Sequence, residues 1–114
     1  EYQYAYDAAW DAGSKVWREG FDARGTLNEK ICCPRDEDGA PVNNGFFAAV
    51  KEVGSTENII CGHEHLNDFS IMYEGVRLTY TLKVGMGSGS KSGMNGGTKI
   101  TVSDTGLSIE HLYR

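Results

Sequence analysis

Large apolar side chains recur every three or four residues from position 2 to position 18, with Asp7, Asp11 and Lys15 on another face. This spacing predicts an aromatic-rich amphipathic helix over residues 2–18. We expect the aromatic rings of this helix to pack in the core, and the lining of a cleft is the alternative. The four rings are those of Tyr2, Tyr6, Trp10 and Trp17.

A long connection is predicted after this helix. Apolar periodicity is lost from Arg18 to Val42, where glycines and prolines interrupt the chain repeatedly. The charged run Arg35-Asp36-Glu37-Asp38 inside it is typical of a solvated loop. An acidic cation site is the alternative, although the run lacks the spacing of a calcium-binding loop.

A second helix and a buried strand are predicted next. Asn43-Asn44 can cap a helix, and Gly54 can end it in a left-handed conformation. Residues 58–61 form a short apolar run that ends at Gly62, as expected of a buried strand that opens into a loop. The apolar face of the helix would consist of Phe46, Phe47, Val50 and Val53.

Two β-hairpins are predicted in the C-terminal half. The first joins residues 69–73 to residues 76–84 through Glu74-Gly75, which is a two-residue turn signal. The second joins residues 99–102 to residues 107–113. This order of elements predicts an α/β fold, with about two helices on one face of a mixed sheet that contains antiparallel hairpins.

Length and charge exclude several classes of function. The chain has 114 residues, which suits one domain, and its formal net charge is −5 from 16 acidic and 11 basic residues. The basic residues are scattered, so binding of nucleic acid through bulk charge is not expected. No apolar run approaches the ~20 residues of a membrane span. Without an initiator Met or a leader, the sequence reads as a mature product or an excised piece, which leaves localisation unknown.

The cysteine pattern argues against a disulfide framework. Cys32, Cys33 and Cys61 are odd in number, and the first two are adjacent, so that a bridge between them would be strained. We expect small, buried or half-buried thiols in a reducing compartment, which weakly favours the cytoplasm.

Two histidines follow the apolar run in the stretch Ile-Ile-Cys-Gly-His-Glu-His-Leu-Asn-Asp-Phe. On extended chain the imidazoles of His63 and His65 would point the same way, and would reach one metal ion or two neighbouring ions. Gly62 lets the backbone pass close to such a site. The side chain of Asn67 or Asp68 can orient a ligating imidazole through a hydrogen bond to the ring nitrogen that does not bind the metal.

The stretch Gly62-His63-Glu64-His65 resembles the GH-x-H motif of calcineurin-like metallophosphoesterases. The continuation Leu66-Asn67-Asp68-Phe69 is similar to the branch that contains purple-acid-phosphatase-like enzymes. The resemblance covers residues 43–102 and includes the hairpin that begins Tyr73-Glu74-Gly75-Val76. Glu1-Tyr2 matches the Pro-Glu-Tyr that follows an upstream ligand histidine in this family.

The resemblance implies the C-terminal part of an α/β/β/α sandwich that hydrolyses phosphoesters, including phosphorylated small molecules. In such a protein His63 and His65 would bind separate ions of a dinuclear centre, with manganese, iron or zinc as the candidates. The ions would activate water and stabilise charge on the phosphoryl oxygens. Glu64 stands where the family commonly has a non-ligand Asp. No residue of this chain is assigned as a catalytic acid or base.

Other ligand motifs of the family are missing from the sequence. It has no D-x-H and no G-D followed by G-N-H-E, and His111 stands too near the end of a terminal strand to replace them. We therefore expect residues 1–114 to be a partial domain whose N-terminal half belongs to the same longer chain. We expect this piece to be inactive by itself and to expose apolar surface made for the missing half.

The glycine-rich residues 84–92 do not match the phosphate-binding G-x-x-x-x-G-K-[ST] loop, because Ser90 stands where glycine is needed. A mobile connection between two strands is expected instead. In the resembled family this loop lies near the metal cleft.

Two other functions compete with the phosphoesterase. In one, Cys61, His63 and His65 join Cys32 or Cys33 in a closed zinc site that stabilises a binding module. In the other, the domain has kept the fold and lost the chemistry. Substitution of Cys61 by Ser would lower zinc content and stability only if the zinc module is correct.

Overall fold

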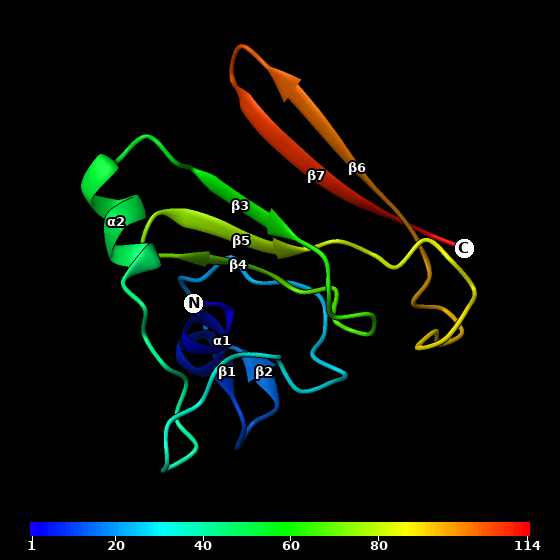
Figure 1. Ribbon diagram of the computed structural model, residues 1–114. Helices are drawn as coiled ribbons and strands as arrows, with labels where there is room; N and C mark the ends of the chain where they lie inside the picture. Colours follow the sequence, from blue (N-terminus) through cyan, green and yellow to red (C-terminus); the bar gives the residue numbers. More distant parts are fainter.

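A three-stranded mixed sheet forms the centre of the structure (Figure 1). In the computed structural model, which describes residues 1–114, the strand order is β3 (Asn58–Cys61), β5 (Val76–Tyr80) and β4 (Ser70–Tyr73). Strand β3 runs parallel to β5, whereas β4 runs antiparallel to it. The predicted α/β class, with a mixed sheet and antiparallel hairpins, is confirmed.

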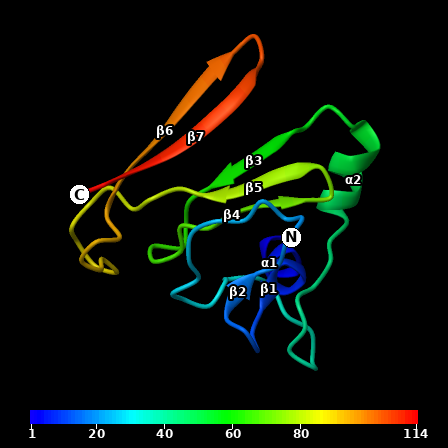
Figure 2. The ribbon, with the colours of Figure 1, turned by 180° about the vertical axis from the view of Figure 1, so that it is seen from behind.

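The N-terminal helix covers one face of this sheet but is shorter than predicted. Helix α1 spans Tyr2–Ala9, and the chain then forms the short antiparallel strands β1 (Trp10–Asp11) and β2 (Val16–Trp17). The prediction of a helix over residues 2–18 is therefore wrong beyond Ala9. Figure 2 shows α1 and this small hairpin together on one side of the central sheet.

Local hydrogen bonds and ring packing end α1 early. The Oδ1 atom of Asp11 accepts the backbone N–H groups of Gly13 at 3.0 Å and Ser14 at 3.4 Å, which turns the chain back. Trp10 and Trp17 then face each other across the hairpin with ring centroids 4.9 Å apart. Helical periodicity in the sequence does not distinguish this aromatic hairpin from two further helical turns.

The aromatic rings of the N-terminal segment pack in the core, as predicted. Phe69 has no exposed surface, and its ring lies 5.7 Å from that of Tyr6 and 6.2 Å from that of Tyr2. Burial of this apolar surface is the main stabilising contribution to the fold. The buried core consists of Ala5, Ala9, Ile31, Phe47, Phe69, Ile71, Val76, Leu78 and Tyr80.

Helix α2 (Phe46–Val53) has the predicted bounds, and Gly54 ends it with φ of 74° as expected. Its N-cap is Gly45, whereas Asn43-Asn44 was the predicted cap. The side-chain oxygen of Asn43 accepts the N–H of Gly45, and that of Asn44 accepts the N–H of Phe46, the first residue of the helix. Among the apolar residues of this helix, only Phe47 is buried.

The predicted strands after α2 are present with small changes. Strand β3 coincides with residues 58–61, but it is half-buried because it lies at the edge of the sheet. The β4–β5 hairpin turns at Glu74-Gly75 as predicted, and β5 ends at Tyr80. No helix or named strand lies between β2 and α2, which confirms the predicted long connection. The charged run of residues 35–38 within this connection is mostly exposed.

Strands β6 (Gly96–Ser103) and β7 (Gly106–Tyr113) form a separate long hairpin that projects beside the central sheet (Figure 1). This is the second predicted hairpin, but its first strand begins at Gly96 and not at residue 99. Several of its apolar side chains are exposed, namely those of Ile100, Val102, Leu112 and Tyr113. Neither helix is long and apolar enough to cross a bilayer.

We predict that Tyr2→Phe destabilises the chain by about 1–3 kcal/mol, because it leaves buried polar groups without a partner. The Tyr2 hydroxyl lies 2.8 Å from the carbonyl oxygen of Ile59 on β3, and accepts the N–H of Thr79 on β5 at 3.1 Å. Tyr6→Phe is the matched control, since its hydroxyl makes no hydrogen bond within the chain. Urea denaturation measures both free energies of unfolding, and equal losses would contradict the prediction.

Candidate metal-binding site

The two candidate histidines lie in the turn of residues 62–68, directly after β3, as the sequence predicts. Because β3 and β5 are parallel, their carboxyl ends meet at the edge of the sheet where this turn begins. His63 has φ of 82°, so the backbone is left-handed there and not extended. The expectation that both imidazoles point the same way from extended chain is therefore wrong.

Hydrogen bonds fix the 62–68 turn against residues 26–32 of the long connection. The Oδ1 atom of Asn67 accepts the backbone N–H groups of Asn28 at 2.8 Å and Glu29 at 3.0 Å, and its amide group donates to the carbonyl oxygen of Glu29. The carboxylate of Glu29 in turn accepts the N–H of Leu66 at 2.6 Å. The two segments therefore exchange hydrogen bonds in both directions.

Asp68 makes a second group of contacts in the same junction. Its Oδ1 atom accepts the N–H of Thr26 at 2.6 Å and the hydroxyl of Thr26 at 2.9 Å, while Oδ2 accepts the hydroxyl of Tyr113. Asn67 and Asp68 are buried, and none of their side-chain hydrogen bonds goes to His63 or His65. They hold the turn against residues 26–29, and the orientation of a ligating ring by either side chain stays a prediction.

Gly25 allows these two segments to approach so closely. Its φ is +84°, and a Cβ atom at this position would lie 2.5 Å from the carbonyl oxygen of Asp68 and 2.7 Å from the Cα atom of Phe69. Any side chain would push the two backbones apart. The junction thus requires glycine here for both conformation and space.

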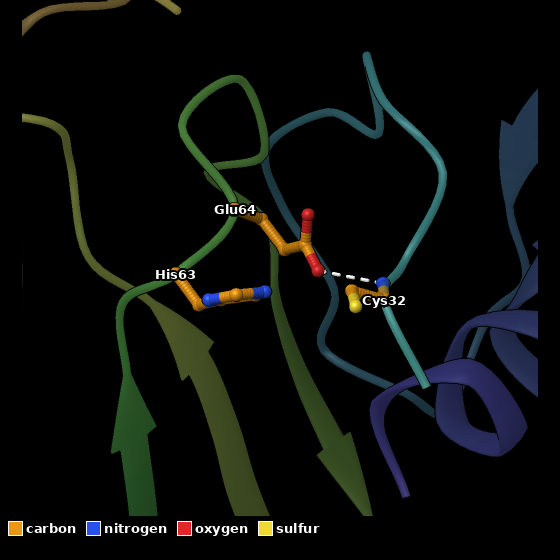
Figure 3. Close-up of side chains that lie close together, drawn as sticks. All are labelled: Cys32, His63 and Glu64. Carbon is orange, nitrogen blue, oxygen red and sulfur yellow. Dashed lines mark hydrogen bonds between the residues drawn. The ribbon is translucent and has the colours of Figure 1, made fainter. Parts of the chain in front are cut away.

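The junction brings Cys32, His63 and Glu64 together (Figure 3). One possible ligand atom from each residue lies within 4.8 Å of the other two. The Oε1 atom of Glu64 accepts the backbone N–H of Cys32 at 2.6 Å, which joins the turn to the end of residues 26–32. Glu64 is buried, with 7% of its surface exposed, whereas Cys32 and His63 are exposed.

These three side chains lie on the wall of an open cavity of about 230 Å³. Cys33 and Cys61 line the same cavity, so all three cysteines of the chain meet at one place. The cysteines are free thiols; Cys33 and Cys61 are half-buried as predicted, whereas Cys32 is exposed. No lysine or arginine side chain lines the cavity, whose remaining residues are Glu1, Tyr2, Gln3, Ile31, Gly62 and Tyr80.

Three ionisable side chains that line this cavity have pKa values above their ordinary range. Burial raises the pKa of the Cys61 thiol above its ordinary value. Burial likewise raises the pKa of the Tyr2 and Tyr80 hydroxyls, with a smaller contribution from the neighbouring Cys61. Cys61 is half-buried and lies outside the close group of ligand atoms, although sequence reasoning counted it as a possible zinc ligand.

His65 lies apart from this group, beside the glycine-rich loop. A Cβ atom at Gly89 would lie 2.3 Å from Nδ1 of His65, so the ring rests against the backbone of that loop. The expectation that the loop lies near the candidate metal ligands is met at this position. His111 is half-buried, and its ring nitrogens contact the hydroxyl of Thr98 and the carbonyl oxygen of Asp68.

The ligand atoms of Cys32, His63 and Glu64 suit a divalent transition metal. A thiol, an imidazole and a carboxylate are the ligand types that zinc accepts, and imidazole also suits iron and manganese sites. His63 has two other potential ligands beside it, whereas His65 belongs to no such group of three. Sequence reasoning missed Glu64, because its partner Cys32 is 32 residues away and no local pattern marks the pair.

Comparison with known proteins gives one partial and distant relationship. Over 65 residues, or 57% of this chain, it is 31% identical to "Probable inactive purple acid phosphatase 14" of Arabidopsis thaliana. The chain spans about 15% of the length of that protein. No protein-family model and no solved structure matches the chain. The similarity supports a phosphoesterase relationship and does not extend to activity.

We predict that Gly89→Ala displaces the His65 ring, since the new methyl group would occupy its position and φ there is +73°. The imidazole resonances of His65 should shift in a nuclear magnetic resonance spectrum, while those of His63 stay unchanged. Gly87→Ala is the matched control in the same loop, because nothing lies within 4 Å of its added Cβ. Identical spectra for the two variants would refute the contact between His65 and the loop.

Proposed function

We propose that this chain is the C-terminal portion of a metal-dependent phosphoesterase, in which His63 and His65 bind separate ions of a dinuclear centre. The observation that carries the proposal is the Gly62-His63-Glu64-His65 turn at the end of β3, whose two histidines are exposed, in a chain with partial similarity to a purple acid phosphatase-like protein. Phosphorylated small molecules or other phosphoesters are the proposed substrates.

The surroundings of the two histidines support separate roles for them. His63 faces the cavity that Glu1 also lines, and the resemblance matches Glu1 to a residue just after an upstream ligand histidine. His65 rests against the glycine-rich loop instead. Two imidazoles directed to different surroundings suit two ions better than one shared ion.

This chain contributes positioning and two ligands to the proposed centre. Because Asn67 and Asp68 fix the turn through backbone hydrogen bonds, little ordering of the turn is needed when metal binds. When bound, two divalent ions of manganese, iron or zinc lower the pKa of water and neutralise charge on the phosphoryl oxygens. The D-x-H and G-N-H-E segments expected upstream would contribute the remaining ligands and the general acid.

We predict that the 114-residue chain alone hydrolyses no phosphomonoester, even with excess manganese or zinc. The chain lacks the D-x-H and G-N-H-E segments, and with them the remaining ligands of the two-metal centre and the general acid that hydrolysis there requires. A chromogenic phosphomonoester assay measures this, with the same metals and no protein as the background. Turnover that exceeds the background and is abolished in His63→Asn would contradict the missing-ligand account.

The full-length gene product provides the decisive test of the proposal. We predict that it hydrolyses phosphoesters with added metal, and that His63→Asn and His65→Asn each lower kcat at least ~100-fold, given the cost of losing metal-site contacts. His111→Asn, which removes an imidazole outside the turn, should retain most of the activity.

Two results would overturn the proposal for the full-length protein. Absence of activity, together with absence of D-x-H and G-N-H-E segments, would favour a domain that has kept the fold without the chemistry. The printed name of the Arabidopsis relative, which includes the word inactive, makes this outcome a specific competitor. Activity that survives both histidine substitutions would show that the centre lies elsewhere.

A zinc-stabilised binding module is the second candidate function. It is favoured by the cavity in which Cys32, Cys33, Cys61 and His63 meet. In this case metal would contribute to folding free energy, and removal of zinc by a chelator would lower the unfolding temperature. Loss of that stabilisation in Cys61→Ser would favour the module, whereas the phosphoesterase proposal expects little change.

A further inference from the structure

We propose that Cys32, His63 and Glu64 form a mononuclear site for a zinc-class divalent cation, contained entirely within this chain. The site uses neither His65 nor Cys61, and so differs from both candidate functions above. It does not rest on the phosphoesterase proposal. If the dinuclear centre exists, the cation inferred here is the one that His63 binds.

The convergence of three different donor types is the first argument. Cys32 approaches from the long connection, and His63 and Glu64 approach from the turn after β3 (Figure 3). Their ligand atoms lie within 4.8 Å of one another. Zinc bonds of ~2.0–2.3 Å place tetrahedral donors about 3.3–3.8 Å apart, so closure requires a movement of about 1 Å. Cys32 and His63 are exposed and can make this movement by small side-chain rotations.

The position of Glu64 is the second argument. A buried carboxylate is costly unless its oxygens are paired. Oε1 accepts the backbone N–H of Cys32, and this is the only hydrogen bond of the side chain. Oε2 has no hydrogen bond within the chain and is not fully enclosed, so it can bind a cation while Oε1 holds the carboxylate in place. The same hydrogen bond fixes the backbone that carries the Cys32 thiol.

Charge is the third argument. A bound thiolate and the Glu64 carboxylate would carry two negative charges, which match one divalent cation, with neutral imidazole as the third ligand. The cavity has no lysine or arginine side chain that would compete for these groups. Thiolate and imidazole together select zinc, or cobalt as its probe, over magnesium and calcium. The fourth coordination position faces the open cavity and suits water.

Titration of the 114-residue chain with Co²⁺ tests the site, because cobalt bound to a thiolate gives a characteristic near-ultraviolet charge-transfer band. We expect one Co²⁺ per chain, a band from one thiolate, and displacement of the cobalt by Zn²⁺. The Cys32→Ser variant should lose the band. His63→Asn, which tolerates the left-handed backbone, and Glu64→Gln, which keeps an acceptor for the Cys32 N–H, should weaken binding at least ~10–100-fold.

Cys33→Ser and His111→Asn are the matched controls, since the first removes a thiol one position away and the second removes an imidazole outside the 62–68 turn. Both should bind cobalt as the unmodified chain does. Absence of the band from the unmodified chain would overturn the proposal. Retention of the band in Cys32→Ser, with its loss in Cys33→Ser or Cys61→Ser, would also overturn it. Circular dichroism of each variant establishes that binding is compared between folded chains.

These outcomes are distinguishable from failure of the phosphoesterase proposal. Cobalt binding concerns the isolated chain, whereas hydrolysis concerns the full-length gene product. Loss of the cobalt band in His65→Asn would show that His65 is needed together with the thiolate, and would contradict the inference made here. Normal cobalt binding with an inactive full-length protein would leave this site in place and remove only the phosphoesterase.

Discussion

The hydrogen-bonded junction between residues 26–32 and the 62–68 turn is the constraint on which the candidate site depends. Asn67, Glu29 and Glu64 each place a side-chain oxygen on backbone N–H groups of the opposite segment. Buried polar groups are costly without such partners, so the two segments stabilise each other or are both lost. The junction lies beside the central sheet, but the backbone hydrogen bonds between the strands do not include residues 62–68 and would not by themselves hold this turn in place.

The junction also explains the chemical character of the site. It joins a segment that carries adjacent cysteines to a turn that carries two histidines and a buried carboxylate. The result is a cavity lined by three thiols, an imidazole and a buried carboxylate, together with the hydroxyls of Tyr2 and Tyr80. Such a cavity favours a transition-metal cation, whether the ion acts alone or as one member of a larger centre.

The sequence alone was sufficient to predict those structural features that neighbouring residues determine. Gly54 and Glu74-Gly75 mark a helix end and a hairpin through their own backbone preferences, and the structure has both. It was insufficient where distant residues decide the outcome. The helix predicted through residue 18 ends early because Trp10 packs against Trp17, and the role of Glu64 depends on a backbone group 32 residues away.

Amide hydrogen exchange in Asn67→Ala tests the central claim most directly. Loss of the Asn67 side chain should increase the exchange rates of the Asn28, Glu29 and Cys32 amides at least ~10-fold, while the β5 amides keep their protection. That result would show that the junction, and not the sheet, holds Cys32 beside Glu64. Unchanged exchange at Cys32, or an equal increase throughout β5, would contradict the account.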